Sequence, residues 1–180
     1  MSDERVVSTS APYTAGGGTP GDAWGAEAAA AGGKGAQRIT FAGPVAATAD
    51  VAAALRVGVG DLVVARRRLV LLDGAPVETA DAFYPEAVAA GTPLAVPSRI
   101  PGGAAGFLAG MGYRAYYVRE EIRARPPTDE ERADLRIPDG EPVLVLTRLS
   151  VTSEGTPFEY AVMKMRSAGR VLRYDLPVSS

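Results

Sequence analysis

The sequence contains no cysteine and no histidine. The first absence excludes disulfides, thiol catalysis and cysteine-based metal sites. The second removes imidazole, the side chain whose charge changes most readily near neutral pH. Any chemistry must therefore use Asp, Glu, Tyr, Lys, Ser, Thr or backbone amides, and we expect neither a metal ion nor a cofactor.

Long apolar runs are also missing. No segment approaches the about 18 apolar residues of a membrane-spanning helix, and the N-terminus lacks a basic region followed by an apolar one. We therefore expect a cytoplasmic protein without membrane contact. The net charge of −2 and the lack of a basic recognition helix argue against nucleic-acid binding by this chain.

The 180 residues suit a single domain. Residues 1–37 are rich in Gly and Ala, with Trp24 as the lone large anchor, and are predicted to form a flexible linker. The alternative is a short helix that docks Trp24 onto the domain, which we place at residues 38–177. The 17 arginines against 2 lysines, with abundant Ala and Gly, indicate a GC-rich genome, most simply an actinobacterial one.

The folded part contains an internal repeat. The run "TADVAAALRVGVGDLVVARRRL" from residue 48 aligns without a gap with "TDEERADLRIPDGEPVLVLTRL" from residue 128, and the turns "DGAP" and "EGTP" follow. Each copy predicts a helix capped by Thr48 or Thr128, then a turn and a β-hairpin, and Glu131 completes a capping-box pattern in the second copy. The predicted fold is therefore α+β, with one antiparallel sheet flanked by short helices and built from two helix–turn–hairpin units. A first strand is expected at 37–45, a helix at 101–113 and a further strand at 113–127.

Three adjacent arginines interrupt the first hairpin. Side chains of a strand alternate between its faces, so Arg66 and Arg68 share one face while Arg67 takes the other. The repeat aligns Arg68 with Arg148, but it aligns Arg66 with Leu146, so position 66 lies on a face that tolerates burial. A covered guanidinium needs an anion or a carbonyl cluster, and arginine is well suited to bind a carboxylate through two hydrogen bonds.

Two interpretations of these arginines stay open. They could pair with Glu78, Asp81 or Glu159 on the neighbouring strands, which would make them structural. Alternatively, Arg66 and Arg68 could meet the polar end of a ligand.

Two further motifs allow both a structural and a binding interpretation. Gly102 and Gly103 open a helix whose free backbone N–H groups could bind an anion, or they could only permit a tight entry to that helix. In "YAVMKM", Tyr160 lies on one strand face and Met163 and Met165 lie on the other. Methionine fills cores, but it also lines pockets for apolar ligands.

The order and spacing of "RRRLVLLDGAPVETADAFYP", "GGAAGFLAGMGYR" and "VLVLTRLSVTSEGTPFEYAVMKM" resemble the UTRA domain. This is the effector-binding domain of the HutC subfamily of GntR-type bacterial transcription regulators, and it shares its fold with chorismate lyase. The resemblance covers roughly residues 38–177, and "GDAW.AEAA..G..G.QR" before it is similar to the actinobacterial branch. It implies an antiparallel sheet flanked by helices, a cleft for a small effector and a homodimer.

The resemblance also implies roles for single positions. Arg68 matches the arginine that contacts the effector in sugar-phosphate-binding members, and Glu159 matches a glutamate of the last hairpin. Gly103, Ala80 and Met165 stand where those members carry a serine, an acidic residue and a tyrosine. Loss of these polar groups implies a ligand with an apolar body and one anionic or carbonyl group.

These arguments give one set of candidate ligand-binding residues: Arg66, Arg68, Asp81, Gly102, Gly103, Arg148, Glu159, Tyr160, Met163 and Met165.

The leading hypothesis is an effector-binding domain of a GntR/HutC-type regulator. Since residues 1–37 are too few for the winged helix-turn-helix of the family, we expect no direct DNA binding by this chain. The alternative is a cofactor-independent lyase or cyclase on the same fold, in which Arg68, Asp81 and Glu159 would be catalytic. A third candidate is a module that pairs with a full-length regulator and inactivates it.

Overall fold

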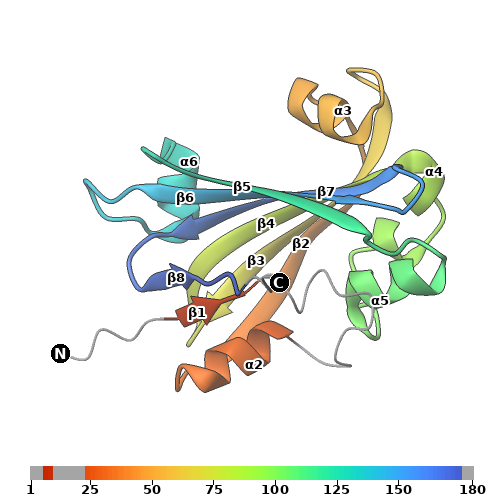
Figure 1. The fold of residues 1–180 in the computed structure, drawn as a ribbon. Helices are drawn as coiled ribbons and strands as arrows, with labels where there is room; N and C mark the ends of the chain where they lie inside the picture. Colours follow the sequence, from red (N-terminus) through yellow and green to blue (C-terminus); the bar gives the residue numbers. More distant parts are fainter. Residues whose placement is uncertain (1–5, 10–22, 176–180) are drawn as a thin grey trace, which may run out of the picture.

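Figure 1 shows the protein as a computed structural model, in which residues 6–9 and 23–175 are described. The core is a six-stranded antiparallel sheet. Its strands, in the order in which they neighbour one another, are β2 (Gly35–Ala46), β3 (Leu62–Leu72), β4 (Ala75–Pro85), β7 (Pro157–Arg166), β6 (Val143–Val151) and β5 (Tyr117–Arg125). The helices are α2 (Ala23–Ala30), α3 (Ala49–Leu55), α4 (Glu86–Ala89), α5 (Gly103–Gly110) and α6 (Asp129–Leu135), with a 3₁₀ turn at Pro93–Ala95. A separate parallel pair joins β1 (Val6–Ser8) to β8 (Arg170–Leu172). None of the helices in these described residues is long and apolar enough to cross a bilayer.

The internal repeat is confirmed by the structure. The unit β2–α3–β3–β4 recurs as β5–α6–β6–β7, and the two units meet in the centre of the sheet, where β4 pairs with β7. Asp81 lies opposite Val162, its own equivalent in the second copy, so a pseudo-two-fold axis passes between them. Both helices end in the same way, because Arg56 and Arg136 adopt left-handed backbone conformations with φ of 57° and 51°.

The two helix starts differ. In the second copy Thr128 and Glu131 form the predicted capping box, in which the Glu131 N–H donates to the Thr128 hydroxyl and the Thr128 N–H donates to the Glu131 carboxylate. Thr48 occupies the same position before α3, but its side chain makes no capping hydrogen bond. Thr48 therefore holds the predicted N-cap position, but it lacks the side-chain hydrogen bond that Thr128 makes.

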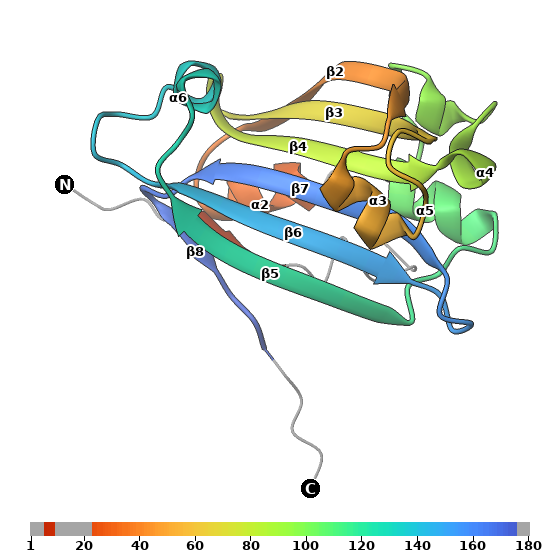
Figure 2. The same cartoon turned by 90° about the horizontal axis from the view of Figure 1, so that it is seen from above.

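The helices divide between two faces of the sheet (Figures 1 and 2). On the α3–α6 face, α3 packs against Val63 and Phe83, and α6 packs against Val145. On the opposite side, which we call the α5 face, α4 and α5 pack against Val64 and Ala161. Because strand side chains alternate, each strand residue can be assigned to one of these faces.

Residues 23–37 form ordered structure and not a free linker. Trp24 of α2 is 3 % exposed and packs against Val6, Ala28 and Val70. Its indole N–H donates to the carbonyl of Leu71 at 2.9 Å. The docked-helix alternative is therefore the arrangement that these residues adopt, whereas residues 1–5 and 10–22 of the expected linker lie outside the described part.

Candidate ligand-binding site

Strand β3 presents its three arginines to different surroundings. Arg67 lies on the α3–α6 face, where it is exposed and its guanidinium lies 5.4 Å from the centre of the Phe41 ring. Arg66 and Arg68 lie on the α5 face with Val64, as the alternation of strand side chains predicts. Only these two can therefore meet a ligand on that face.

Arg66 forms its hydrogen bonds within the protein. It is 5 % exposed, and its guanidinium donates to the carbonyl oxygens of Val96, at 2.7 Å, and of Ser98. The carbonyls of Pro93 and Leu94 lie at 3.5 Å. Burial lowers the pKa of Arg66, and the cluster of carbonyls compensates its charge. Arg66 thus fixes the segment 93–98 over the sheet, so of the two interpretations left open for it the structural one agrees with these contacts.

Arg148, the repeat equivalent of Arg68, also has a partner inside the protein. Its Nε lies 2.5 Å from Oε1 of Glu120, and both side chains are only about one-tenth exposed. Glu120 stands directly opposite Arg148 on the neighbouring edge strand. This ion pair gives Arg148 a structural role.

Arg68 occupies the same position of the repeat as Arg148, but its surroundings differ. The residue opposite it on the neighbouring edge strand is Ile39, where the second copy has Glu120. Its guanidinium donates to Oε1 of Gln37 at 3.2 Å, and no carboxylate of residues 6–9 or 23–175 forms an ion pair with it. Arg68 is half-buried and is thus the guanidinium of the α5 face that remains open to an anionic or carbonyl group.

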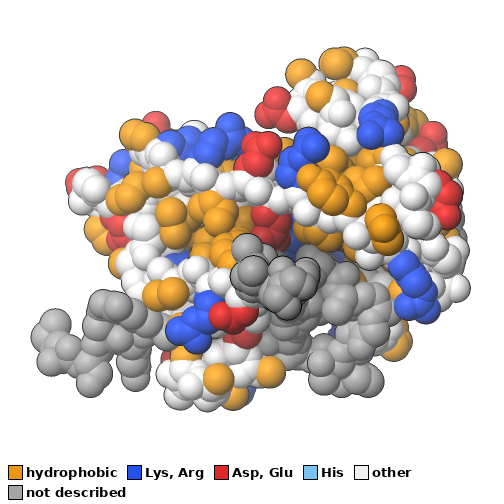
Figure 3. Space-filling model, in the orientation of Figure 1, with side chains coloured by type: hydrophobic (Ala, Val, Ile, Leu, Met, Phe, Trp, Pro, Cys, Tyr) orange, Lys and Arg blue, Asp and Glu red, His pale blue; other side chains and the backbone are white. Residues whose placement is uncertain are grey.

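An apolar row extends across the sheet from Arg68. Arg68 lies opposite Ala80, which in turn lies opposite Met163. Met163 faces Leu146, and Leu146 faces Ile122 of the edge strand β5, whose side chain is 44 % exposed. Neighbouring strands are about 4.8 Å apart, so the row presents a band of small and flexible apolar side chains with Arg68 near one end. Figure 3 shows hydrophobic side chains gathered in patches on the visible side of the molecule, with charged side chains between them.

Glu159 reaches the same face through a contact that the sequence analysis missed. The hydroxyl of Tyr84, which is almost fully buried, donates to Oε1 of Glu159 at 2.9 Å. Burial, reinforced by the negative charge of Glu159, raises the pKa of Tyr84 well above its usual value of 10. Tyr84 therefore remains a protonated donor that fixes the Glu159 carboxylate. The sequence did contain a signal for this contact, because Tyr84 follows Ala82 by two residues on β4 and therefore lies on the α5 face as well.

The remaining glycine and methionine candidates have separate places in the fold. Gly102 and Gly103 precede or open α5 with φ of 75° and 79°, a conformation that disfavours other residues, whereas the space around them is open. Ala104, the next residue, packs against the same cluster as Met163. Met165 is 2 % exposed in the next row, between Glu78 and Leu144, and serves as core.

Two predicted site residues lie on the other face of the sheet. Tyr160 packs against α3 with Phe83. Asp81 lies on the α3–α6 face, where burial raises its pKa while the nearby charges of Arg67 and Lys164 lower it. The three groups proposed for an enzyme, Arg68, Asp81 and Glu159, are consequently divided between the two faces. The structure therefore does not bring these three groups together in one site.

The comparisons with known proteins agree with this architecture. Residues 31–168 match the UTRA domain family. The chain belongs to this family. An HTH-type transcriptional regulator of Streptomyces coelicolor is 37 % identical over 137 residues, which cover 74 % of this chain and 51 % of that protein.

Solved structures extend the likeness. A GntR-family transcriptional regulator shares 27 % identity over 82 % of this chain and 60 % of its own, with a TM-score of 0.72. The effector domain of PhnF from Mycobacterium smegmatis matches with the same TM-score of 0.72 over 87 % of this chain and 95 % of its own, at 18 % identity, which shows the shared fold. The expected α+β effector-domain fold is confirmed. The chain spans about half the length of the Streptomyces coelicolor relative that it matches.

Proposed function

We propose that this UTRA domain is the effector-binding part of a GntR/HutC-type regulator and that its effector binds on the α5 face. The effector has a short apolar body and one carboxylate or carbonyl group. Its polar end meets Arg68, and its body lies over Ala80 and Met163.

The observation that carries the proposal is the asymmetry between Arg68 and Arg148. Both occupy the same position of the repeat, but Glu120 neutralises only Arg148. A half-buried guanidinium without a carboxylate partner gains most from an anionic or carbonyl ligand. The apolar neighbours of Arg68 leave few polar groups to bind a sugar.

Binding would act on the rest of the regulator through a change in populations. An effector can shift a conformational equilibrium only by its difference in affinity for the two states. We propose that those states differ in the arrangement of two UTRA domains in a homodimer, which changes the DNA affinity of an attached domain.

The test is native mass spectrometry of the purified protein after incubation with a metabolite extract of Streptomyces coelicolor, the source of the 37 % identical relative. We expect wild-type protein and Arg67→Ala to retain the same small molecule, and Arg68→Ala to lose it. Arg67 is the matched control, because it is the next residue of the same strand and points to the other face. Equal retention by both variants, or no retained molecule in any protein, would overturn the proposal.

A further inference from the structure

Most charged side chains on the α5 face of the sheet are neutralised within the protein. Arg66 donates to the carbonyl oxygens of Val96 and Ser98, and Arg148 pairs with Glu120 of the neighbouring strand. A buried charge is tolerated when it is paired in this way. The charges of Arg66 and Arg148 are therefore compensated inside the fold.

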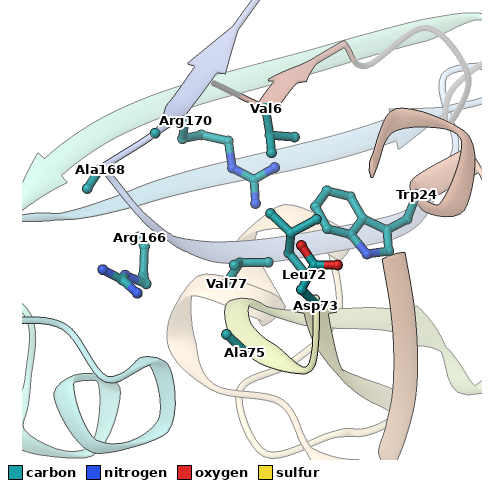
Figure 4. A pocket seen from close by; sticks show the side chains of 10 residues that line it. Val6, Trp24, Leu72, Asp73, Ala75, Val77, Arg166, Ala168 and Arg170 are labelled. Carbon is teal, nitrogen blue, oxygen red and sulfur yellow. The ribbon is translucent and has the colours of Figure 1, made fainter. Parts of the chain in front are cut away.

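Glu78, two residues before Ala80 on β4, is compensated as well. Its carboxylate lies 3.4 Å from the guanidinium of Arg170, whose side chain is 4 % exposed. Figure 4 shows this guanidinium beside the indole of Trp24, at the wall of a hollow of about 250 Å³. Arg170 also donates to the Ser8 hydroxyl at 2.8 Å, so both of these polar contacts are internal.

Glu159 differs from these residues and resembles Arg68. Its side chain is half-buried, and the Tyr84 hydroxyl donates to its Oε1 at 2.9 Å. No arginine or lysine in residues 6–9 and 23–175 forms an ion pair with the Glu159 carboxylate, just as no carboxylate there pairs with Arg68. Within this part of the chain, the α5 face of the sheet thus carries one positive and one negative side chain without a partner of opposite charge.

Arg68 and Glu159 border the same stretch of the sheet. Two strand spacings and four residues along β7 separate them, which places their Cα atoms about 16 Å apart. The floor between them consists of three small side chains, those of Ala80, Ala82 and Ala161. Burial raises the pKa of Tyr84, and the positive charge of Arg68 opposes this rise, so Arg68 acts on the hydroxyl that holds Glu159.

Two opposite charges at the ends of an apolar floor restrict the chemistry of a ligand that fits them. Hydrogen bonds between charged groups are about twice as strong as those between neutral groups. A fatty acid compensates only Arg68, whereas a chain with a carboxylate at one end and an ammonium at the other compensates Arg68 and Glu159 together. Its methylene groups then cover the alanine floor.

We propose that the effector is an ω-amino acid, whose carboxylate accepts from Arg68 and whose ammonium donates to the Glu159 carboxylate. Tyr84 occupies Oε1 of Glu159, so the ammonium binds at Oε2. The inference rests on the function proposed above and adds the positively charged end of the ligand.

Isothermal titration calorimetry of the wild-type protein tests this ligand class. The ligands are 4-aminobutanoate, 6-aminohexanoate and 8-aminooctanoate, each compared with the fatty acid in which a methyl group replaces the ammonium: pentanoate, heptanoate and nonanoate. We expect at least one amino acid to bind about tenfold or more tightly than its fatty acid. The ω-hydroxy acid of that same length should bind about threefold or more weakly than the amino acid, because its hydroxyl carries no charge.

Three variants assign the two ends of the ligand. Glu159→Gln should remove the preference for the amino acid and leave the affinity for the fatty acid unchanged, whereas Arg68→Ala should abolish binding of both. Glu154→Gln is the control, because Glu154 is exposed in the turn of the same hairpin, and it should keep the preference. Since the comparison of ligands is made on the wild-type protein, it decides the question even where a variant folds poorly.

The outcomes separate this inference from the proposed effector site. Fatty acids that bind through Arg68 as tightly as the amino acids would overturn the inference and leave the effector site in place. Equal binding of the hydroxy acid, a preference that survives Glu159→Gln, or no binding of any amino acid would overturn it as well. The effector site itself fails only in the comparison of Arg68→Ala with Arg67→Ala described above.

Discussion

At the scale of single residues, the groups that surround each guanidinium decide what an arginine does. Arg66 faces a loop rich in carbonyls, Arg148 faces Glu120, and Arg67 stacks over Phe41. Arg68 faces Ile39 and Ala80, so its guanidinium is left with Gln37. These four arginines, at three positions of the repeat, therefore comprise two structural arginines, one surface arginine and one candidate for binding.

The structural role of Arg66 leads to a prediction about stability. Arg66→Ala removes the guanidinium that donates to the carbonyls of Val96 and Ser98, and the Val96 carbonyl then keeps the N–H of Ser98 as its donor. Because hydrogen bonds to a charged group contribute about 1.5–3 kcal/mol, we expect the free energy of unfolding to fall by about 3 kcal/mol. Urea unfolding followed by far-UV circular dichroism measures this change. Arg67→Ala is the control and should stay within about 0.5 kcal/mol of wild type; equal effects of the two substitutions would show that the carbonyl cluster contributes nothing.

At the scale of elements, the repeat provides two versions of one helix start. Thr128→Ala removes the hydroxyl that accepts from the Glu131 N–H, so we expect a loss of about 1 kcal/mol. Thr48→Ala removes a hydroxyl that makes no capping hydrogen bond, so its cost should be a few tenths of a kcal/mol. Chemical denaturation of the two single variants compares them directly. Equal losses would contradict the difference that the structure shows between the two caps.

The same cap predicts how stability depends on pH. Hydrogen bonds from Arg125, together with those from the Thr128 N–H and Lys164, hold the pKa of Glu131 at about 2, below its usual 4.5. A carboxylate with a lowered pKa in the folded state stabilises the fold above pH 4.5, and this contribution is lost as the pH falls towards 2. It amounts to at most about 3 kcal/mol.

Glu131→Gln should therefore reduce the stability at pH 6 and flatten its decline between pH 5 and 2. Unfolding free energies measured at several pH values test this, with the exposed Glu130→Gln as control. A decline in Glu131→Gln as steep as in the wild type would assign the acid sensitivity to other groups.

At the scale of the whole molecule, the duplication was predictable from sequence because both copies keep the residues that shape the chain. Gly60 and Gly140 occupy the left-handed region at equivalent turns, as do Arg56 and Arg136 at the helix ends. Such local signals predict the helix and the hairpin of each copy. The two copies then form one sheet through a single central strand pairing, that of β4 with β7.

The site was less predictable because it depends on contacts between segments distant in sequence. The segment 93–98 contains no motif from which its carbonyl cluster could be predicted, yet its carbonyls accept the hydrogen bonds of Arg66. Asp81 and Tyr160 were grouped with Arg68 by residue type, but the alternation of β4 and β7 places them on the other face. Helix α2 docks on the sheet through Trp24, which contacts Leu71 and Val70. These partners are more than 40 residues away in sequence, so the sequence alone did not identify them.

The edges of the sheet bear on how two copies of the domain could associate. Strand β5 is an edge strand of nine residues, visible at the front of Figure 2, and Tyr117 and Ile122 on it are 50 % and 44 % exposed. An uncovered edge of this length offers a row of free backbone groups to another strand. Antiparallel pairing with a second copy about Ile122 would place Glu121 opposite Arg123 on both sides of the axis, a favourable pair. It would also place Arg119 opposite Arg125, whose charge is compensated by Glu131.

We therefore predict that the homodimer forms along β5 and that Ile122→Lys disrupts it. Two lysines would then face each other across the axis, where like charges directly opposite are destabilising. Native mass spectrometry at about tens of micromolar protein should show a dimer for the wild type and a monomer for Ile122→Lys. Val59→Lys makes a comparable change at an exposed position of the α3–β3 turn and should remain dimeric. A wild-type monomer would remove the dimer from the proposed mechanism, whereas a dimer that survives Ile122→Lys would place the interface on another surface than β5.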